Sequence, residues 1–213
     1  MTLPFQFSIR KFRRLASTST TAQQYAKQGS PEGLVIVADH QTQGRGRLGR
    51  KWVSPAGKDL LFSILLRPPL SPSKAPLLSQ VICRSVALVL KKYYRLLPAF
   101  KRPNDLLIQG KKICGVLLES QSNGCYSFCH SRESGNPKHG FPIKAFGNDN
   151  FKKVVDYVVI GIGLNVNSSI SKQVPTAISL KELQGKELRK ELVLKRILNQ
   201  IRKDLQGIYA SGT

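Results

Sequence analysis

Apolar residues occur in short blocks along the chain, and the spacing inside each block predicts its secondary structure. Residues 34–41, "LVIVADHQ", and residues 58–68, "KDLLFSILLRP", are continuous apolar runs of strand length. Residues 156–167, "DYVVIGIGLNVN", form a third run, in which Gly161 and Gly163 leave room for another segment to approach the backbone. These three segments predict buried β-strands.

Other segments repeat apolar residues at helical spacing. Residues 75–97 do so over about 20 positions. Residues 179–210 predict a short turn and a longer amphipathic helix, separated by Gly185. A further helix is predicted for "STSTTAQQYAKQG", residues 17–29, because its first hydroxyl side chains can cap exposed N–H groups and Gly29 can end it.

Two regions complete the predicted sheet. Residues 99–120 predict a hairpin with a tight turn at Gln109-Gly110. Near the N-terminus, Phe5, Phe7 and Ile9 alternate with polar residues, in a segment that also has the acid-free, Arg- and Ser-rich composition of a transit peptide. We interpret it as a strand because it continues without a break into the first helix. Together these elements predict an α+β fold with a mixed, largely antiparallel sheet flanked by helices.

One segment shows no period at all. Residues 125–152 are rich in Ser, Gly, Asn and Pro and interrupt two segments that would otherwise be adjacent strands. The entropy cost of closing a loop rises only with the logarithm of its length, so a fold can tolerate such an insertion. We expect a single domain over residues 1–213, with a disordered surface insertion at about 125–152.

The charge balance is unusual for a chain that is 41% hydrophobic. The chain has 34 Lys and Arg against 12 Asp and Glu, a formal net charge of +22 at pH 7. That field attracts nucleic acids, acidic proteins and phosphorylated small molecules without choosing among them. The same charge can also reflect a basic proteome and carry no function.

The cysteines indicate a reducing compartment, and the hydropathy predicts no membrane span. Cys83 and Cys114 lie in apolar segments and are interpreted as small buried hydrophobes. Cys125 and Cys129 with His139 suggest a zinc site only weakly, because no second spaced pair supports one. No apolar stretch reaches the roughly 18 residues of a membrane span. We therefore expect a soluble, cytoplasmic protein without a membrane partner.

Candidate chemistry gathers at three glycine-containing stretches, "GRGRLGR", "NDLLIQGKKICG" and "GIGLN". None matches a Walker P-loop or G-x-G-x-x-G. In the first stretch Arg45, Arg47 and Arg50 are spaced by glycines, so main-chain N–H groups and guanidinium groups could bind one anion. An RGG-like nucleic-acid tether is the alternative, but the stretch is short, occurs once and is flanked by predicted strands.

Four motifs in order resemble the catalytic domain of biotin–protein ligases. They are "STSTTAQQYA", "QTQGRGRLGRKWVSP", "KRPNDLLIQGKKICGVLLES" and "VVIGIGLNVN". The resemblance runs from about Ser17 to about Ile208 outside the insertion, and the ordered combination is specific although each motif alone is weak. It implies the class II synthetase-like fold of the catalytic domain of biotin and lipoate ligases.

The resemblance also implies a reaction. Biotin and ATP would form biotinyl-5′-AMP and pyrophosphate, with Mg²⁺ as the metal. Biotin would then pass to a lysine of a biotin carboxyl carrier protein, the subunit or domain of an acetyl-CoA or propionyl-CoA carboxylase. Sheet pairing across a homodimer is a family property that the sequence leaves open. We expect no specific nucleic acid among the partners.

By family position, several residues acquire roles. Lys112 would be the catalytic lysine, assisted by Arg45, Arg47 and Asp105, and Asp105 with Asn104 would hold Mg²⁺–phosphate and orient the incoming amine. The residues implied for biotin are Ser17, Thr18, Gln41, Gly44, Arg45, Lys112 and Gly115. Those implied for the nucleotide are Gly46, Arg47, Trp52, Asn104 and Asn165.

The sequence departs from the family pattern in several places. Arg102 stands where the motif K-W-P-N-D has tryptophan, and Ser19 replaces the Asn of S-T-N. We also expect neither the small C-terminal SH3-like barrel nor the N-terminal DNA-binding domain that many relatives carry. Three alternatives therefore stay open: an inactive ligase copy, a lipoate- or octanoate-attaching relative, and a basic nucleic-acid-binding protein. "GRGRLGR" and "KRPND" argue against the lipoate alternative.

Overall fold

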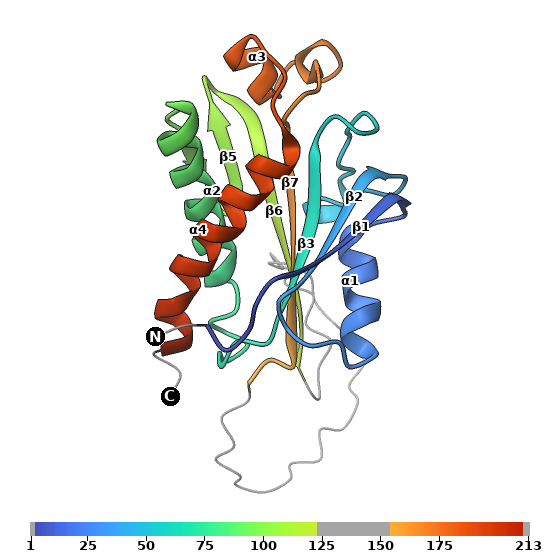
Figure 1. Cartoon of the computed structure of the whole chain (residues 1–213), viewed down its shortest axis with the longest axis vertical. Coiled ribbons are helices and arrows are strands. Elements are labelled where there is room, and N and C mark those ends of the chain that lie inside the picture. The colour runs from blue at the N-terminus through green and yellow to red at the C-terminus, as the bar shows by residue number, and fades with distance from the viewer. Residues whose placement is uncertain (1–2, 123–153, 211–213) are drawn as a thin grey trace, which may run out of the picture.

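The computed structural model describes residues 3–122 and 154–210, which contain one seven-stranded sheet in the order β1-β2-β3-β7-β6-β5-β4 (Figure 1). β1 (Ser8–Leu15) and β2 (Leu34–Gln41) are parallel, and every other neighbouring pair is antiparallel. The mixed, largely antiparallel sheet predicted from the sequence is therefore confirmed. The predicted insertion at about 125–152 lies outside the described residues.

The remaining elements follow the predicted blocks closely. The other strands are β3 (Leu60–Leu66), β4 (Ala99–Lys101), β5 (Asp105–Ile108), β6 (Lys111–Gln121) and β7 (Tyr157–Leu164). The helices are α1 (Thr18–Lys27), α2 (Leu77–Tyr94), α3 (Leu180–Gln184) and α4 (Lys190–Ala210), with 3₁₀ turns at Arg47–Gly49 and Ile170–Lys172. None of the helices in these two ranges is long and apolar enough to cross a membrane.

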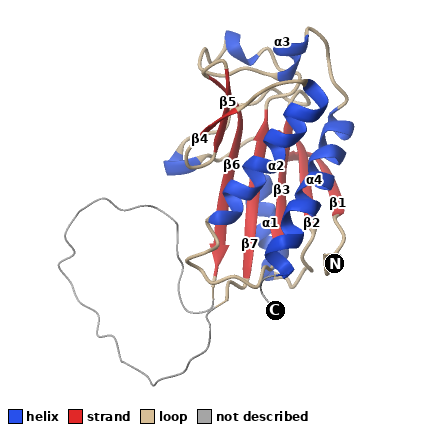
Figure 2. Ribbon diagram, turned by 90° about the vertical axis from the view of Figure 1, so that its left-hand side faces the viewer, coloured by secondary structure: helices blue, strands red, loops and turns tan. Residues whose placement is uncertain are grey.

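The sheet is covered by helices on both faces (Figures 1 and 2). α2 and α4 pack on one face, where Phe62, Ile160 and Ile162 join the larger apolar core. α1 packs on the other face, where Leu65 and Val159 join a smaller core. Central strands buried on both faces explain why the sequence shows continuous apolar runs instead of alternation.

Two turns follow the residue types that the sequence offers. Gln109 and Gly110 have φ values of 53° and 75°, which is the positive-φ pair of a two-residue hairpin turn between β5 and β6. Gly185 ends α3 with φ 70°, and Ser179 starts it in a capping box with Glu182. The hairpin turn and the break at Gly185 were both predicted from these residues.

The first strand lies further along the chain than the apolar alternation indicates. Phe5 and Phe7 precede β1 and pack against the larger core, whereas Ile9 inside β1 is 46% exposed. The strand begins where main-chain pairing with β2 begins, at Ser8 opposite Leu34. Its Arg-rich sequence suits an edge strand, because charged side chains discourage pairing with another chain.

A partly buried polar contact ties the end of α4 to the sheet. The Tyr209 hydroxyl donates to the Glu32 carboxylate at 2.6 Å, and the main-chain N–H of Arg67 donates to the same oxygen at 3.0 Å. Burial, and then the hydrogen bond to Glu32, raise the pKa of Tyr209 above its usual range. The Arg67 guanidinium in turn donates to the main-chain carbonyls of Ala26, Ser30 and Asp156.

We expect Tyr209→Phe to lower the free energy of unfolding by about 1.5–3 kcal/mol, because it removes a hydrogen bond to a charged group. Tyr93→Phe is the matched control, since the Tyr93 ring is 44% exposed on α2. Urea unfolding of the two variants measures the difference. Equal stability of both variants would show that the contact with Glu32 does not hold α4 in place.

Candidate active site

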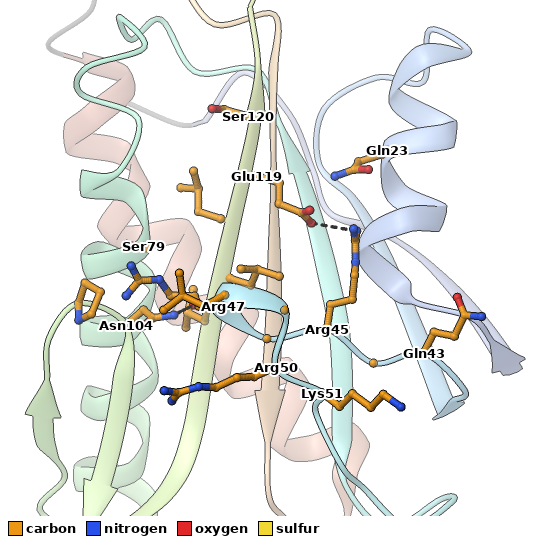
Figure 3. Close-up of a pocket in the computed structure, with 18 of the residues that line it drawn as sticks. Gln23, Gln43, Arg45, Arg47, Arg50, Lys51, Ser79, Asn104, Glu119 and Ser120 are labelled. Carbon is orange, nitrogen blue, oxygen red and sulfur yellow. Dashed lines mark hydrogen bonds and ion pairs between the residues drawn. The ribbon is translucent and has the colours of Figure 1, made fainter. Parts of the chain in front are cut away.

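The basic stretch at residues 44–52 folds into a short hairpin over the sheet (Figure 3). The N–H of Trp52 donates to the carbonyl of Gly44 at 2.9 Å, and the N–H of Gly46 donates to the carbonyl of Arg50 at 2.7 Å. A Cβ at Gly44 would lie 2.7 Å from the Trp52 carbonyl oxygen. Gly44 therefore permits the neck of the hairpin to close.

The side chain of Trp52 rests on two glycines of adjacent strands. β6 and β7 place Gly115 opposite Gly163. A Cβ at Gly163 would lie 2.5 Å from Cε2 of the indole, and one at Gly115 would lie 2.9 Å from Cζ3. The sheet surface is thus bare where the indole lies. Gly161 has the same relation to α1, because a Cβ there would lie 2.5 Å from the Ser19 hydroxyl.

Lys112 lies beside this indole. Its Nζ is 2.7 Å from Oδ1 of Asp105 and 5.3 Å from the centroid of the Trp52 ring. Both side chains are partly exposed, Lys112 at 36% and Asp105 at 23%. The expected opposite orientations of adjacent lysines on a strand appear here: Lys112 lines a cavity, and Lys111 lines neither of the two cavities described below.

A hydroxyl and amide cluster stands at the start of α1. Thr18 donates to Oε1 of Gln41 through both its main-chain N–H, at 2.7 Å, and its hydroxyl, at 3.0 Å. The Ser63 hydroxyl donates to the Thr18 hydroxyl at 2.8 Å, and Ser19 lies 3.0 Å from Ser63. The prediction that a hydroxyl side chain caps α1 is wrong for Ser17, which makes no such bond. Oε1 of Gln41 instead accepts the hydrogen bond of the first N–H group of the helix, that of Thr18.

Two neighbouring cavities lie under and beside the basic hairpin. The smaller one, of about 340 Å³, brings together most of the site residues predicted from the sequence. These are Ser17, Thr18, Gln41, Arg45, Gly46, Arg47, Trp52, Asn104, Asp105, Lys112 and Gly115. Arg102 lines the same cavity, and Gly44 lines only the larger one, of about 760 Å³.

Asn165 is not brought into this group. It is 3% exposed at the end of β7, and its amide donates to the main-chain carbonyls of Lys112 at 3.2 Å and Ile178 at 3.0 Å. These bonds tie the end of β7 to β6 and to the residues before α3. A nucleotide contact through Asn165 stays a prediction.

Glu119 is a site residue that sequence reasoning missed. On β6 it is 3.2 Å from Nη2 of Arg45, and its side chain is 17% exposed (Figure 3). Burial raises the pKa of Glu119, more than the charge of Arg45 and a hydrogen bond from Gln23 lower it. Period two from Gly115 through Leu117 would have placed it on the cavity face.

The chain matches the model of the biotin/lipoate A/B protein ligase family over residues 11–129. It is 32% identical over 189 residues to the bifunctional ligase/repressor BirA of Bacillus spizizenii, covering 86% of this chain and 49% of that protein. It is 27% identical over 174 residues to the biotin–[acetyl-CoA-carboxylase] ligase of Mycobacterium tuberculosis, covering 80% of this chain and 53% of that protein. The chain therefore spans about half the length of these relatives.

The fold is similar to solved structures of the same kind. The biotin protein ligase from Aquifex aeolicus in complex with biotin and ATP superposes with a TM-score of 0.69 at 29% identity, covering 95% of this chain and 72% of that chain. Both the Mycobacterium tuberculosis relative and the Aquifex aeolicus structure are named as biotin ligases.

We expect Gly163→Ala to displace the Trp52 ring, because the new methyl group would lie inside the contact distance of the indole. Trp52 is the only tryptophan of the chain, so a red shift of its fluorescence emission reports the displacement. Gly207→Ala in α4 is the control, since a Cβ there meets nothing within 4 Å. An unshifted emission maximum in Gly163→Ala would show that the indole does not rest on this glycine.

Proposed function

The chain belongs to the biotin/lipoate A/B protein ligase family, and from this we propose that it forms biotinyl-5′-AMP from biotin and ATP and transfers the biotin to a protein lysine. One observation carries the proposal: the smaller cavity combines a buried hydroxyl and amide cluster with Lys112, Arg45 and Arg47. Such a cavity suits a small acid that has a neutral, hydrogen-bonding head and a carboxylate that reacts with a phosphate.

The head of the substrate is assigned to the start of α1. The ureido group of biotin is neutral and offers N–H donors and a carbonyl acceptor. The hydroxyl and amide groups that can donate and accept these hydrogen bonds come from Ser17, Thr18 and Gln41. Ser17 and Thr18 are each 3% exposed. Hydrogen bonds in so buried a place discriminate strongly between ligands. A ligand that cannot form these bonds would leave polar groups of the protein unpaired and out of contact with water.

The charged end of the reaction is assigned to the basic residues. Attack of the carboxylate on the α-phosphate gathers negative charge on oxygens that the protein must stabilise. Fixed cations in a partly dehydrated site supply that stabilisation without reorganising during the reaction. Lys112 is held in place by Asp105, and Arg45 and Arg47 lie on the hairpin above the same cavity. Trp52, already against the glycines, offers the nucleotide an aromatic wall.

The residues present fit a magnesium ion that is bound together with the triphosphate. Asn104 and Asp105 are adjacent, line the smaller cavity and offer amide and carboxylate oxygens, the ligand type that Mg²⁺ prefers. The side-chain nitrogen of Asn104 donates a hydrogen bond to the main-chain carbonyl of Val116, so the donor side of this amide faces the protein. When bound, the ion would neutralise phosphate charge.

The acceptor is a lysine of a biotin carboxyl carrier protein, part of an acetyl-CoA or propionyl-CoA carboxylase. This assignment rests on the family and on the name of the Mycobacterium tuberculosis relative. An acyl adenylate is a reactive mixed anhydride of a carboxylic and a phosphoric acid. The transfer step needs an uncharged amine next to its carbonyl carbon, because an ammonium has no free electron pair. Pairing of two copies through the sheet remains an expectation.

We expect Lys112→Ala to slow biotin-dependent release of pyrophosphate from Mg²⁺-ATP by about 10²–10³-fold, the usual effect of removing one group that stabilises developing charge. Lys111→Ala, the neighbouring lysine that lines neither cavity, should leave the rate near that of the unaltered protein. The release is measured with and without biotin. A folded protein that releases no pyrophosphate in the presence of biotin would overturn the proposed function.

A further inference from the structure

The larger cavity is strongly cationic and has a single acid. The basic side chains that line it are Lys27, Arg45, Arg47, Arg50 and Lys51. Among its described lining residues, Glu119 alone carries a carboxylate. A lysine ammonium that entered this cavity would be repelled by every other charged group there, so Glu119 is its one attractive partner.

Arg45 lies where the two cavities meet and lines both of them. Its guanidinium faces Glu119, and Figure 3 shows the pair between β6 and the basic hairpin. A bound acyl phosphate in the smaller cavity offers Arg45 a second anion. An arginine that turns toward the phosphate leaves the partly buried carboxylate of Glu119 without its cation.

We propose that Glu119 binds the ammonium of the acceptor lysine once Arg45 has turned to the adenylate, and that it takes the proton that makes this amine nucleophilic. The inference rests on the proposed function and adds a residue for its second step. It also orders the two steps, because the ammonium site becomes available only after the adenylate has drawn Arg45 away.

The step balances in atoms and electrons. The lysine ammonium gives one proton to the Glu119 carboxylate, and the freed nitrogen lone pair forms a bond to the carbonyl carbon of biotinyl-5′-AMP. The bond between that carbon and the phosphate oxygen breaks, and its electron pair leaves with AMP. The second proton of the nitrogen passes to solvent, as does the proton held by Glu119.

The surroundings of Glu119 suit a proton acceptor. Burial already holds its pKa above the ordinary value, against the lowering effect of Arg45 and of the hydrogen bond from Gln23. Withdrawal of Arg45 removes one of these lowering causes. Asp105, the acid of the smaller cavity, is instead engaged by Lys112 at 2.7 Å.

Two nucleophiles separate this role from a structural one. The protein is loaded with biotin and Mg²⁺-ATP, and the bound adenylate is then given either Nα-acetyl-lysine, whose side chain is an ammonium, or hydroxylamine, which is uncharged at neutral pH. We expect Glu119→Gln to slow the reaction with Nα-acetyl-lysine by about 10²-fold more than the reaction with hydroxylamine. Glu119→Asp, which keeps the carboxylate, should restore part of the difference.

Glu187→Gln is the matched control, since Glu187 pairs with Lys58 and Lys181 away from both cavities. It should react with both nucleophiles at the rates of the unaltered protein. Equal slowing of both nucleophiles by Glu119→Gln, or no slowing of either, overturns the role of Glu119. Absence of any biotin hydroxamate from the unaltered protein would overturn the proposed function and this inference with it.

Discussion

The site depends on the register between β6 and β7, which sets Gly115 opposite Gly163 and Leu117 opposite Gly161. Three positions without side chains, Gly115, Gly161 and Gly163, then fall on the face of the sheet that α1 covers. This bare surface receives Trp52 from the basic hairpin and Ser19 from α1 at distances that any Cβ would prevent. A register shift by one residue would turn the glycines to the α2 and α4 face and close the site.

The same surface explains how the strongly basic loop is held in place. Arg45 is neutralised by Glu119 from β6, and the indole of Trp52 fixes the other end of the hairpin against the strands. Lys112 is likewise neutralised by Asp105. Each of these cations pairs with a carboxylate of the protein, and each lines a cavity. An anion bound in either cavity would compete with these carboxylates for the cations.

Much of this architecture could be predicted from the sequence, because local rules decide it. Apolar runs gave β2 and β3, helical spacing gave α2, and Gln109-Gly110 gave the turn between β5 and β6. The start of β1 could not be predicted, since pairing with β2 outweighs the alternation of Phe5 and Phe7. Capping of α1 was misjudged for a similar reason: the partner of its first N–H group is Gln41, which is distant in sequence.

The site itself was only partly visible in the sequence. The resemblance to biotin–protein ligases assigned the site residues by family position, and most of them line the smaller cavity. The nucleotide contact that the resemblance implied for Asn165 stays a prediction, and the structure shows its amide donating to two main-chain carbonyls. Glu119 lies near the end of the motif "KRPNDLLIQGKKICGVLLES", but nothing in that motif assigned it a role, and its significance comes from Arg45, which reaches it across 74 positions of sequence.

The central claim is that this chain joins biotin to the nucleotide itself. Incubation with biotin and Mg²⁺-ATP, rapid removal of free ligands and mass spectrometry of what stays bound tests that claim most directly. The account predicts biotinyl-5′-AMP in the protein-bound fraction. Recovery of ATP or AMP with unmodified biotin, and of no nucleotide that carries biotin, would contradict it.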